Sequence, residues 1–146
     1  HSADYKFSKV TCKASEIIKY GHGICYAKAH LLAALLRAND IPVGLCYQKL
    51  ILDDTNPNIF CLHGLNAVYI DSTKKWVRLD ARGNKPGVNA QFELNNECLA
   101  FLVRNNLGEY DYPIIYAKPL PCVLDCLSKY QTTNELFKNL PSDINL

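Results

Sequence analysis

The chain has 146 residues, of which 49% are hydrophobic and 21% charged, so its composition is that of a folded globular protein and excludes a disordered one. This length fits one domain on the usual scale of roughly 100–200 residues, and we expect a single domain over residues 1–146. The net charge of +2 is too small to indicate a nucleic acid or an anionic membrane as a partner. No apolar run approaches the roughly 20 residues that span a bilayer.

The first elements in chain order are two predicted helices. Residues 11–21 indicate a short helix, with Thr11 as its N-cap and Gly21 as its stop. Residues 24–38 carry apolar side chains at helical spacing and are mostly apolar, which predicts a central, buried helix. Asn39 and Asp40 can end that helix in a left-handed conformation, and the proline that follows prevents its continuation.

Three strands are predicted next, at residues 43–52, 60–70 and 75–80. The last two are joined by a hairpin turn at residues 71–74. A Gly/Pro-rich loop covers residues 81–88.

The rest of the chain is less regular. Residues 91–94, 98–103 and 112–117 are candidate strands. Residues 121–130 indicate a helix that starts at a proline, and Thr132 begins a capping box before a last short helix.

The seven cysteines are an odd number and form no C-x-x-C motif, which favours a reducing, cytoplasmic compartment over a disulfide scaffold, a zinc ribbon or a redox pair. Cys25 stands out because it follows a Gly-x-Gly turn at the start of the central helix. The unpaired N–H groups and the dipole of a helix N-terminus favour a thiolate and can hold an oxyanion. A buried structural thiol is the alternative for any single cysteine.

A thiolate nucleophile needs a base, and the base needs an acceptor that orients it. His63 lies in the middle of an otherwise apolar strand, and Asp80 ends the next one. With a two-residue hairpin turn His63 faces Asp80 directly, and with a four-residue turn the two are diagonal neighbours on one face. Both registers bring the imidazole and the carboxylate within reach. A satisfied core histidine and a turn-capping aspartate are the alternative interpretations.

Three strings resemble the transglutaminase-like superfamily, in its order and with similar spacings. GICYAKAHLLAALLRANDIP (23–42) resembles the nucleophile helix and its exit, HGLNAVYI (63–70) the histidine strand, and WVRLDARGN (76–84) the aspartate strand and loop. The Asn-Asp pair before Ile-Pro departs from the usual glycine there. The resemblance covers residues 11–88, is weaker beyond residue 90, and points to a bacterial-type member.

The resemblance implies a papain-like α+β fold, in which a central helix carrying the cysteine packs on an antiparallel sheet carrying the histidine and the aspartate. It implies Cys25 as nucleophile, His63 as general base and acid, and Asp80 as the residue that orients the imidazole. The implied activity is acyl transfer on peptide or protein amides through a thioester, without metal or cofactor. Within this class, a peptidase or amidase is favoured over a crosslinking enzyme. Members of this kind have helices before this region, which here would precede His1.

Three further interpretations remain open. A crosslinking transglutaminase differs only in the nucleophile that resolves the thioester. A catalytically silent binding module would share the fold. A zinc site would use Cys25, Cys61 and His63, although the usual short ligand pairs are absent.

Overall fold

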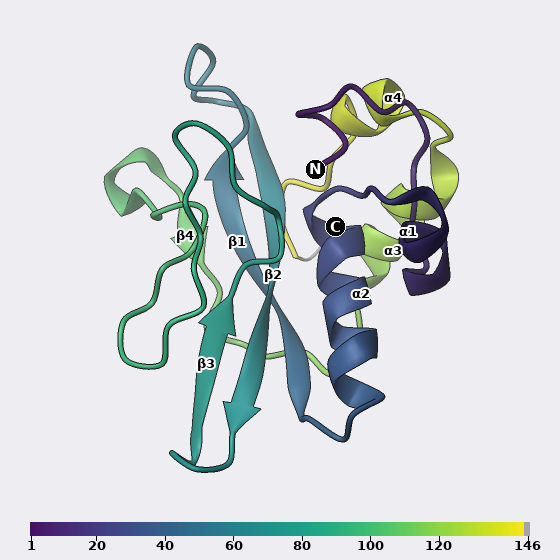
Figure 1. Ribbon diagram of the computed structural model, residues 1–146. Coiled ribbons are helices and arrows are strands. Elements are labelled where there is room, and N and C mark those ends of the chain that lie inside the picture. Colours follow the sequence, from purple (N-terminus) through teal and green to yellow (C-terminus); the bar gives the residue numbers. More distant parts are fainter. Residues whose placement is uncertain (145–146) are drawn as a thin grey trace.

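The computed structural model describes residues 1–144, which form an antiparallel sheet with all the α-helices on one side of it (Figure 1). The sheet has the strand order β3-β2-β1-β4. Its strands are β1 (Val43–Ile51), β2 (Phe60–Ile70), β3 (Lys75–Leu79) and β4 (Tyr110–Asp111). The helices are α1 (Ala14–Tyr20), α2 (Cys25–Arg37), α3 (Pro121–Lys129) and α4 (Thr133–Phe137), with a 3₁₀ turn η1 (Asn105–Leu107). The α+β class with an antiparallel sheet is therefore confirmed.

Helix α2 and strands β1 and β2 build the main core. Tyr26 and Ala29 of α2 pack with Tyr47 of β1 and Leu62 of β2, and each of these is at least 98% buried. Burial of one such large side chain contributes about 1.5–3 kcal/mol. Asp40 adopts φ +58°, so the predicted left-handed exit of this helix is confirmed. The predicted helix and the observed one differ by one residue at each end, as helix termini commonly do.

The β2–β3 hairpin has the longer of the two predicted turns. Ile70 pairs with Lys75 across a turn of residues 71–74, and the ladder runs back to Asn66 opposite Leu79. The two-residue register is therefore wrong. Because pairing stops there, β2 has no β3 partner at His63, and Asp80 lies just past the end of β3.

Of the two predicted N-cap residues, one caps its helix and the other does not. Thr132 caps α4 in the predicted box, with its side chain accepting from the N–H of Glu135. Thr11 does not cap α1, because its hydroxyl donates to the carbonyl of His22 at 3.1 Å. Instead the Glu16 carboxylate accepts from the N–H groups of Cys12 and Lys13, and α1 begins at Ala14.

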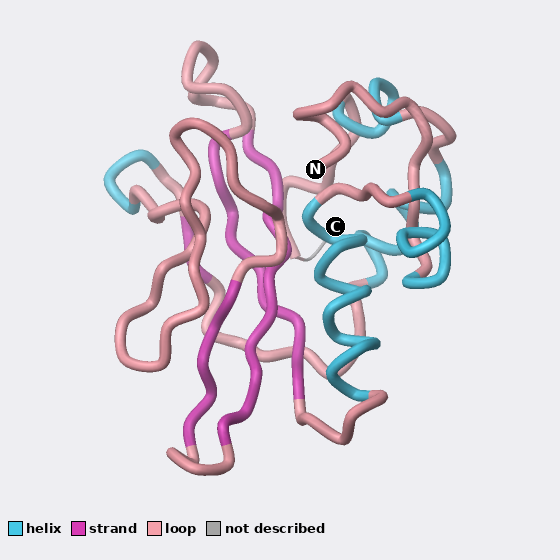
Figure 2. Tube along the Cα trace, in the orientation of Figure 1, coloured by secondary structure: helices cyan, strands magenta, loops and turns pink. Residues whose placement is uncertain are grey.

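The segment between β3 and η1 is irregular along its whole length (Figure 2), so the predicted strands at 91–94 and 98–103 are wrong. Only the isolated bridge Gln91–Cys98 forms within them. Side chains take the place of a ladder: the Asn84 amide bonds both the N–H and the carbonyl of Ala90. The predicted strand at 112–117 is also wrong, since it keeps a single bridge from Tyr116 to Leu45.

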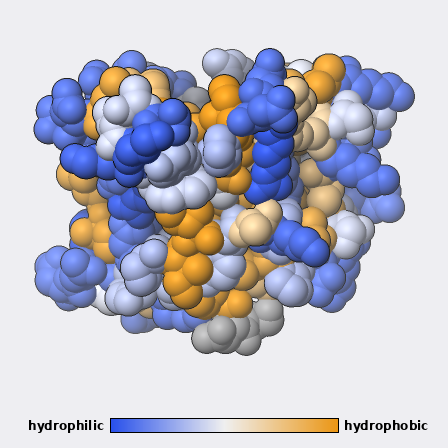
Figure 3. All heavy atoms as spheres, turned by 90° about the horizontal axis from the view of Figure 1, so that it is seen from below, coloured by the Kyte–Doolittle hydropathy of each residue, from blue (hydrophilic) through white to orange (hydrophobic). Residues whose placement is uncertain are grey.

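The surface seen from below is a mixture of hydrophilic side chains and separate apolar patches (Figure 3). Such scattered exposed apolar groups are normal for a folded domain. Among the residues that the structure describes, no helix combines the length and the apolar character needed to cross a membrane.

Candidate active site

Cys25 is the first residue of α2 and lines a cavity of about 710 Å³. The residue before it, Ile24, is the N-cap and provides no side-chain cap to the first turn. The N–H groups of that turn have no side-chain cap from Ile24, and the positive end of the helix dipole lies at Cys25. Cys25 is 9% exposed, so it is mostly enclosed but borders the cavity.

Close packing of Tyr26 against β2 holds this helix start beside His63. The Tyr26 hydroxyl donates to the carbonyl of Leu62 at 2.5 Å. Its ring lies over Gly64, where an added Cβ would come within 2.8 Å of the Tyr26 Cδ1 atom. Only glycine permits this approach, so Gly64 sets the spacing between the start of α2 and strand β2.

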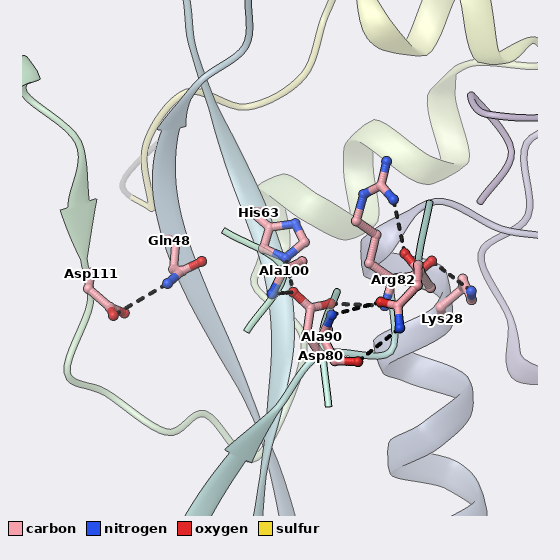
Figure 4. Close-up of polar contacts among 10 residues, drawn as sticks. Lys28, Gln48, His63, Asp80, Arg82, Ala90, Ala100 and Asp111 are labelled. Atoms are coloured by element: carbon pink, nitrogen blue, oxygen red, sulfur yellow. Dashed lines mark hydrogen bonds and ion pairs between the residues drawn. The ribbon is translucent and has the colours of Figure 1, made fainter. Parts of the chain in front are cut away.

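His63 and Asp80 are directly bonded. The His63 Nε2 atom lies 2.6 Å from Asp80 Oδ2, and Figure 4 shows His63 on β2 beside Asp80, which lies just past the end of β3. His63 is 5% exposed and lines the same cavity as Cys25. Because Nε2 bonds Asp80, Nδ1 is the ring nitrogen left for another partner.

The Asp80 carboxylate is held from two further directions. It accepts from the N–H of Arg82 at 2.9 Å and from the N–H of Ala100 at 3.3 Å (Figure 4). Burial favours its neutral form, but the His63 imidazole and these two N–H groups outweigh that effect and lower the pKa of Asp80. The carboxylate is therefore ionised and fixed in orientation at neutral pH.

The pKa of His63 moves in the opposite direction. Burial disfavours the imidazolium, but the hydrogen bonds and charges of Asp80 and Cys25 outweigh it and raise the pKa of His63 to about 10. The imidazole is therefore protonated at neutral pH, with the Asp80 carboxylate bonded to it.

Phe101 completes this arrangement, and sequence reasoning missed it. Its ring meets the His63 ring edge-on, with centroids 5.0 Å apart and planes at 88°. It belongs to the irregular segment that carries the Ala100 N–H donor. No local sequence signal marks Phe101, because its contact is set by a loop folding back over the hairpin.

Several polar side chains just before Cys25 or on β1 lie outside the cavity. Tyr20 and His22, which precede Cys25, do not line it, and His22 instead stacks on Phe7 and bonds Ser2. Tyr47 and Gln48 are buried in the sheet and do not line it either. Within residues 1–144, no group of three or more His, Cys, Asp or Glu side chains is arranged to hold a metal ion.

A cysteine at a helix N-terminus, beside a histidine bonded to a carboxylate, is the arrangement that cysteine acyl-transfer enzymes use. The family model of the transglutaminase-like superfamily matches residues 1–81, more than half of the chain, so the chain belongs to that superfamily. Members of this superfamily are in general cysteine enzymes. The matched range includes Cys25, His63 and Asp80. Comparison with curated proteins and with solved structures finds no significant match to the chain.

Proposed function

We propose that the chain is a cysteine hydrolase of peptide or protein amide bonds, with Cys25 as nucleophile, His63 as general base and acid, and Asp80 as the residue that orients the imidazole. The observation that carries the proposal is the bonded His63–Asp80 pair beside Cys25 in a cavity large enough for a peptide side chain. Cavities of this size are usual for ligand sites.

In the proposed reaction the Cys25 thiolate attacks the amide carbon, and the C=O electron pair moves onto oxygen. The N–H groups of the first turn of α2 stabilise that oxyanion. When the intermediate collapses, the C–N bond breaks and the His63 imidazolium gives its proton to the leaving nitrogen. A thioester to Cys25 remains.

Water then resolves the thioester. Neutral His63 takes a proton from the water as its oxygen attacks the acyl carbon, and the C–S bond breaks with the electron pair returning to sulfur. The products are a carboxylic acid and the regenerated thiolate–imidazolium pair. Asp80 stays ionised throughout and stabilises the imidazolium when it forms.

The test compares wild type with Cys25→Ala on fluorogenic peptide amides and on a glutamine peptide followed by mass spectrometry. We expect amide hydrolysis by wild type, loss of at least about 10³-fold in Cys25→Ala, and inactivation by iodoacetamide with the label on Cys25. Cys98→Ser is the matched control, because Cys98 is a partly exposed thiol outside the cavity.

Two outcomes would change the assignment. Full turnover by Cys25→Ala would overturn the nucleophile. Amine incorporation that exceeds hydrolysis when a primary amine is added would make the chain a crosslinking enzyme.

A further inference from the structure

A group of charged side chains lines the cavity close to the Cys25–His63 pair. The Arg82 guanidinium and the Lys85 ammonium both donate to Asp4 Oδ1, each at 3.0 Å. All three residues line the cavity. Two cations therefore share one carboxylate oxygen, which leaves an excess of one positive charge. We call Asp4, Arg82 and Lys85 the basic cluster.

The basic cluster is one aromatic ring away from the catalytic pair. The Arg82 guanidinium carbon lies 5.5 Å from the centroid of the Phe101 ring, and that same ring meets His63 edge-on. Arg82 also follows Asp80 by two residues and bonds it through its N–H. The Phe101 ring thus contacts both the imidazole and the guanidinium, so the basic cluster borders the same part of the cavity as His63.

Lys28 adds to the positive potential from the helix. It lies three residues after Cys25 on α2, and its Nζ donates to the carbonyl of Arg82 at 2.7 Å (Figure 4). Burial, followed by the charge of Arg82, lowers the pKa of Lys28, although Asp80 and Asp4 act in the opposite sense.

A second group of charged side chains in the same cavity has a net negative charge. Arg104 pairs with Asp54 at 2.8 Å and with Glu109 at 2.6 Å, so one cation meets two carboxylates. These three also line the cavity, from the segments that follow β1 and precede β4. The cavity is thus polarised, and a negatively charged substrate group is favoured only at the basic cluster.

Lys85 has the freedom to bind such a group. Its side chain is 42% exposed, and of its three N–H donors the Asp4 contact uses one. Arg82, only 7% exposed, is held in place by Asp4 and by its own contact with the Gly83 carbonyl. A substrate carboxylate can approach Lys85 without displacing Asp4.

We infer that the site takes acidic substrates: peptide amides that carry a carboxylate next to the amide to be cleaved, bound by Lys85 with the field of Arg82 behind it. This inference rests on the proposed amide hydrolysis and names its substrate class. The carboxylate has two possible sources, an acidic side chain or a free C-terminus, and both present the same chemistry to Lys85.

The kinetic test uses four peptides that differ only in Glu against Gln beside the scissile amide and in a C-terminal acid against an amide. For one of these two contrasts we expect kcat/KM to be about fivefold higher with the acidic peptide than with its neutral partner, and we expect this preference to disappear at 0.5 M salt. The contrast that shows the preference identifies the source of the carboxylate. Lys85→Glu removes or reverses the preference, whereas Lys75→Glu, an exposed lysine beyond the cavity lining, retains it.

A binding test separates this inference from the proposed chemistry. Fluorescence anisotropy with Cys25→Ala and the same labelled peptides measures affinity without turnover, and we expect the same fivefold preference. If wild type turns over all four peptides equally and Cys25→Ala binds them equally, the acidic preference is wrong and the hydrolase stands. If no peptide is turned over but the acidic one binds more tightly in a Lys85-dependent way, the hydrolase is wrong and the acidic preference stands.

Discussion

Residues 1–81 and residues 82–144 contribute to the site in different ways. The first region provides Cys25, His63 and Asp80 from a helix and two strands with regular local patterns. The second provides the Ala100 N–H donor, the Phe101 ring and the Arg82 guanidinium, and between β3 and η1 it has no helix and no strand longer than a bridge.

This difference separates two tasks. Reacting groups need positions that do not move, and regular elements with a shared core provide them. The surrounding groups here, Ala100, Phe101 and Arg82, belong to loop segments and are held by isolated hydrogen bonds, ion pairs and ring contacts, and loops vary in sequence more than regular elements do. The superfamily match covers the first region only. We therefore expect changes in the first region to affect the chemistry most, and changes in the second to adjust it.

The largest expected effect is that of Asp80→Asn. The substitution removes the charge that stabilises the imidazolium and places an amide where the N–H groups of Arg82 and Ala100 donate. We expect kcat to fall by about 10²–10⁴-fold with little change in KM. Steady-state kinetics checks this, with circular dichroism to show that the fold is kept. Activity near that of wild type would remove Asp80 from the site.

The same pair predicts how stability depends on pH. Because the pKa of His63 is raised to about 10, its stabilising contribution is complete below the unfolded value of about 6.5 and declines as pH rises toward 10. The lowered pKa of Asp80 gives a contribution that is present above about pH 4 and lost in stronger acid. The stability advantage of wild type over His63→Gln, measured by urea unfolding, should shrink from pH 6 to pH 10. A constant difference over that range contradicts the assignment.

Gly64→Ala should have the next largest effect on activity. The new methyl group would lie 2.8 Å from Tyr26 Cδ1, so the helix start must shift away from β2. We expect a loss of about 1–3 kcal/mol in the free energy of unfolding and a parallel loss of activity. A double-mutant cycle with Tyr26→Ala supplies the control, because the cost of Gly64→Ala should largely disappear once the ring is gone. If the cost persists there, Tyr26 is not its cause.

In the second region, Phe101→Ala should have a moderate effect. Without the ring, water reaches the His63–Asp80 pair and the imidazole gains freedom to rotate. We expect kcat to fall about tenfold and the pH profile to shift, while unfolding changes less than for Gly64→Ala. Phe92→Ala is the matched control, because Phe92 lies in the same segment, is 52% exposed and does not line the cavity. An unchanged pH profile would leave Phe101 a packing residue only.

Arg78→Ala should have the smallest effect on the chemistry. Its guanidinium bonds both Glu97 and Asp111 at 2.6–2.8 Å, and thereby ties β3 to the irregular segment and to β4. We expect a loss of about 1–2 kcal/mol by thermal or urea unfolding, and only a small loss of activity through the loosened loop. Lys74→Ala breaks the exposed pair with Asp71 instead and should change stability by less than about 0.5 kcal/mol.

The sequence by itself determined the elements that carry the candidate triad. The sequence located α2, β1, β2 and β3 to within about one residue, because a packed helix repeats its apolar residues every 3.6 positions and strands buried on both faces are short apolar runs bounded by turn residues. The sequence also predicted that His63 and Asp80 lie close together, since both of the predicted hairpin registers put them on one face of the sheet. The choice between those registers came only from the structure, where Ile70 pairs with Lys75.

Only the tertiary structure decided what surrounds the candidate triad. Ala100, Phe101 and Arg82 act through contacts between segments distant in sequence, and such contacts leave no periodic trace. In the candidate strand at 98–103, the N–H of Ala100 donates to the Asp80 side chain and not to a neighbouring strand, and the Asn84 side chain bonds both backbone groups of Ala90, just before the candidate strand at 91–94. Local patterns fix local geometry, whereas the partners of an isolated hydrogen bond are chosen by the packing of the whole chain.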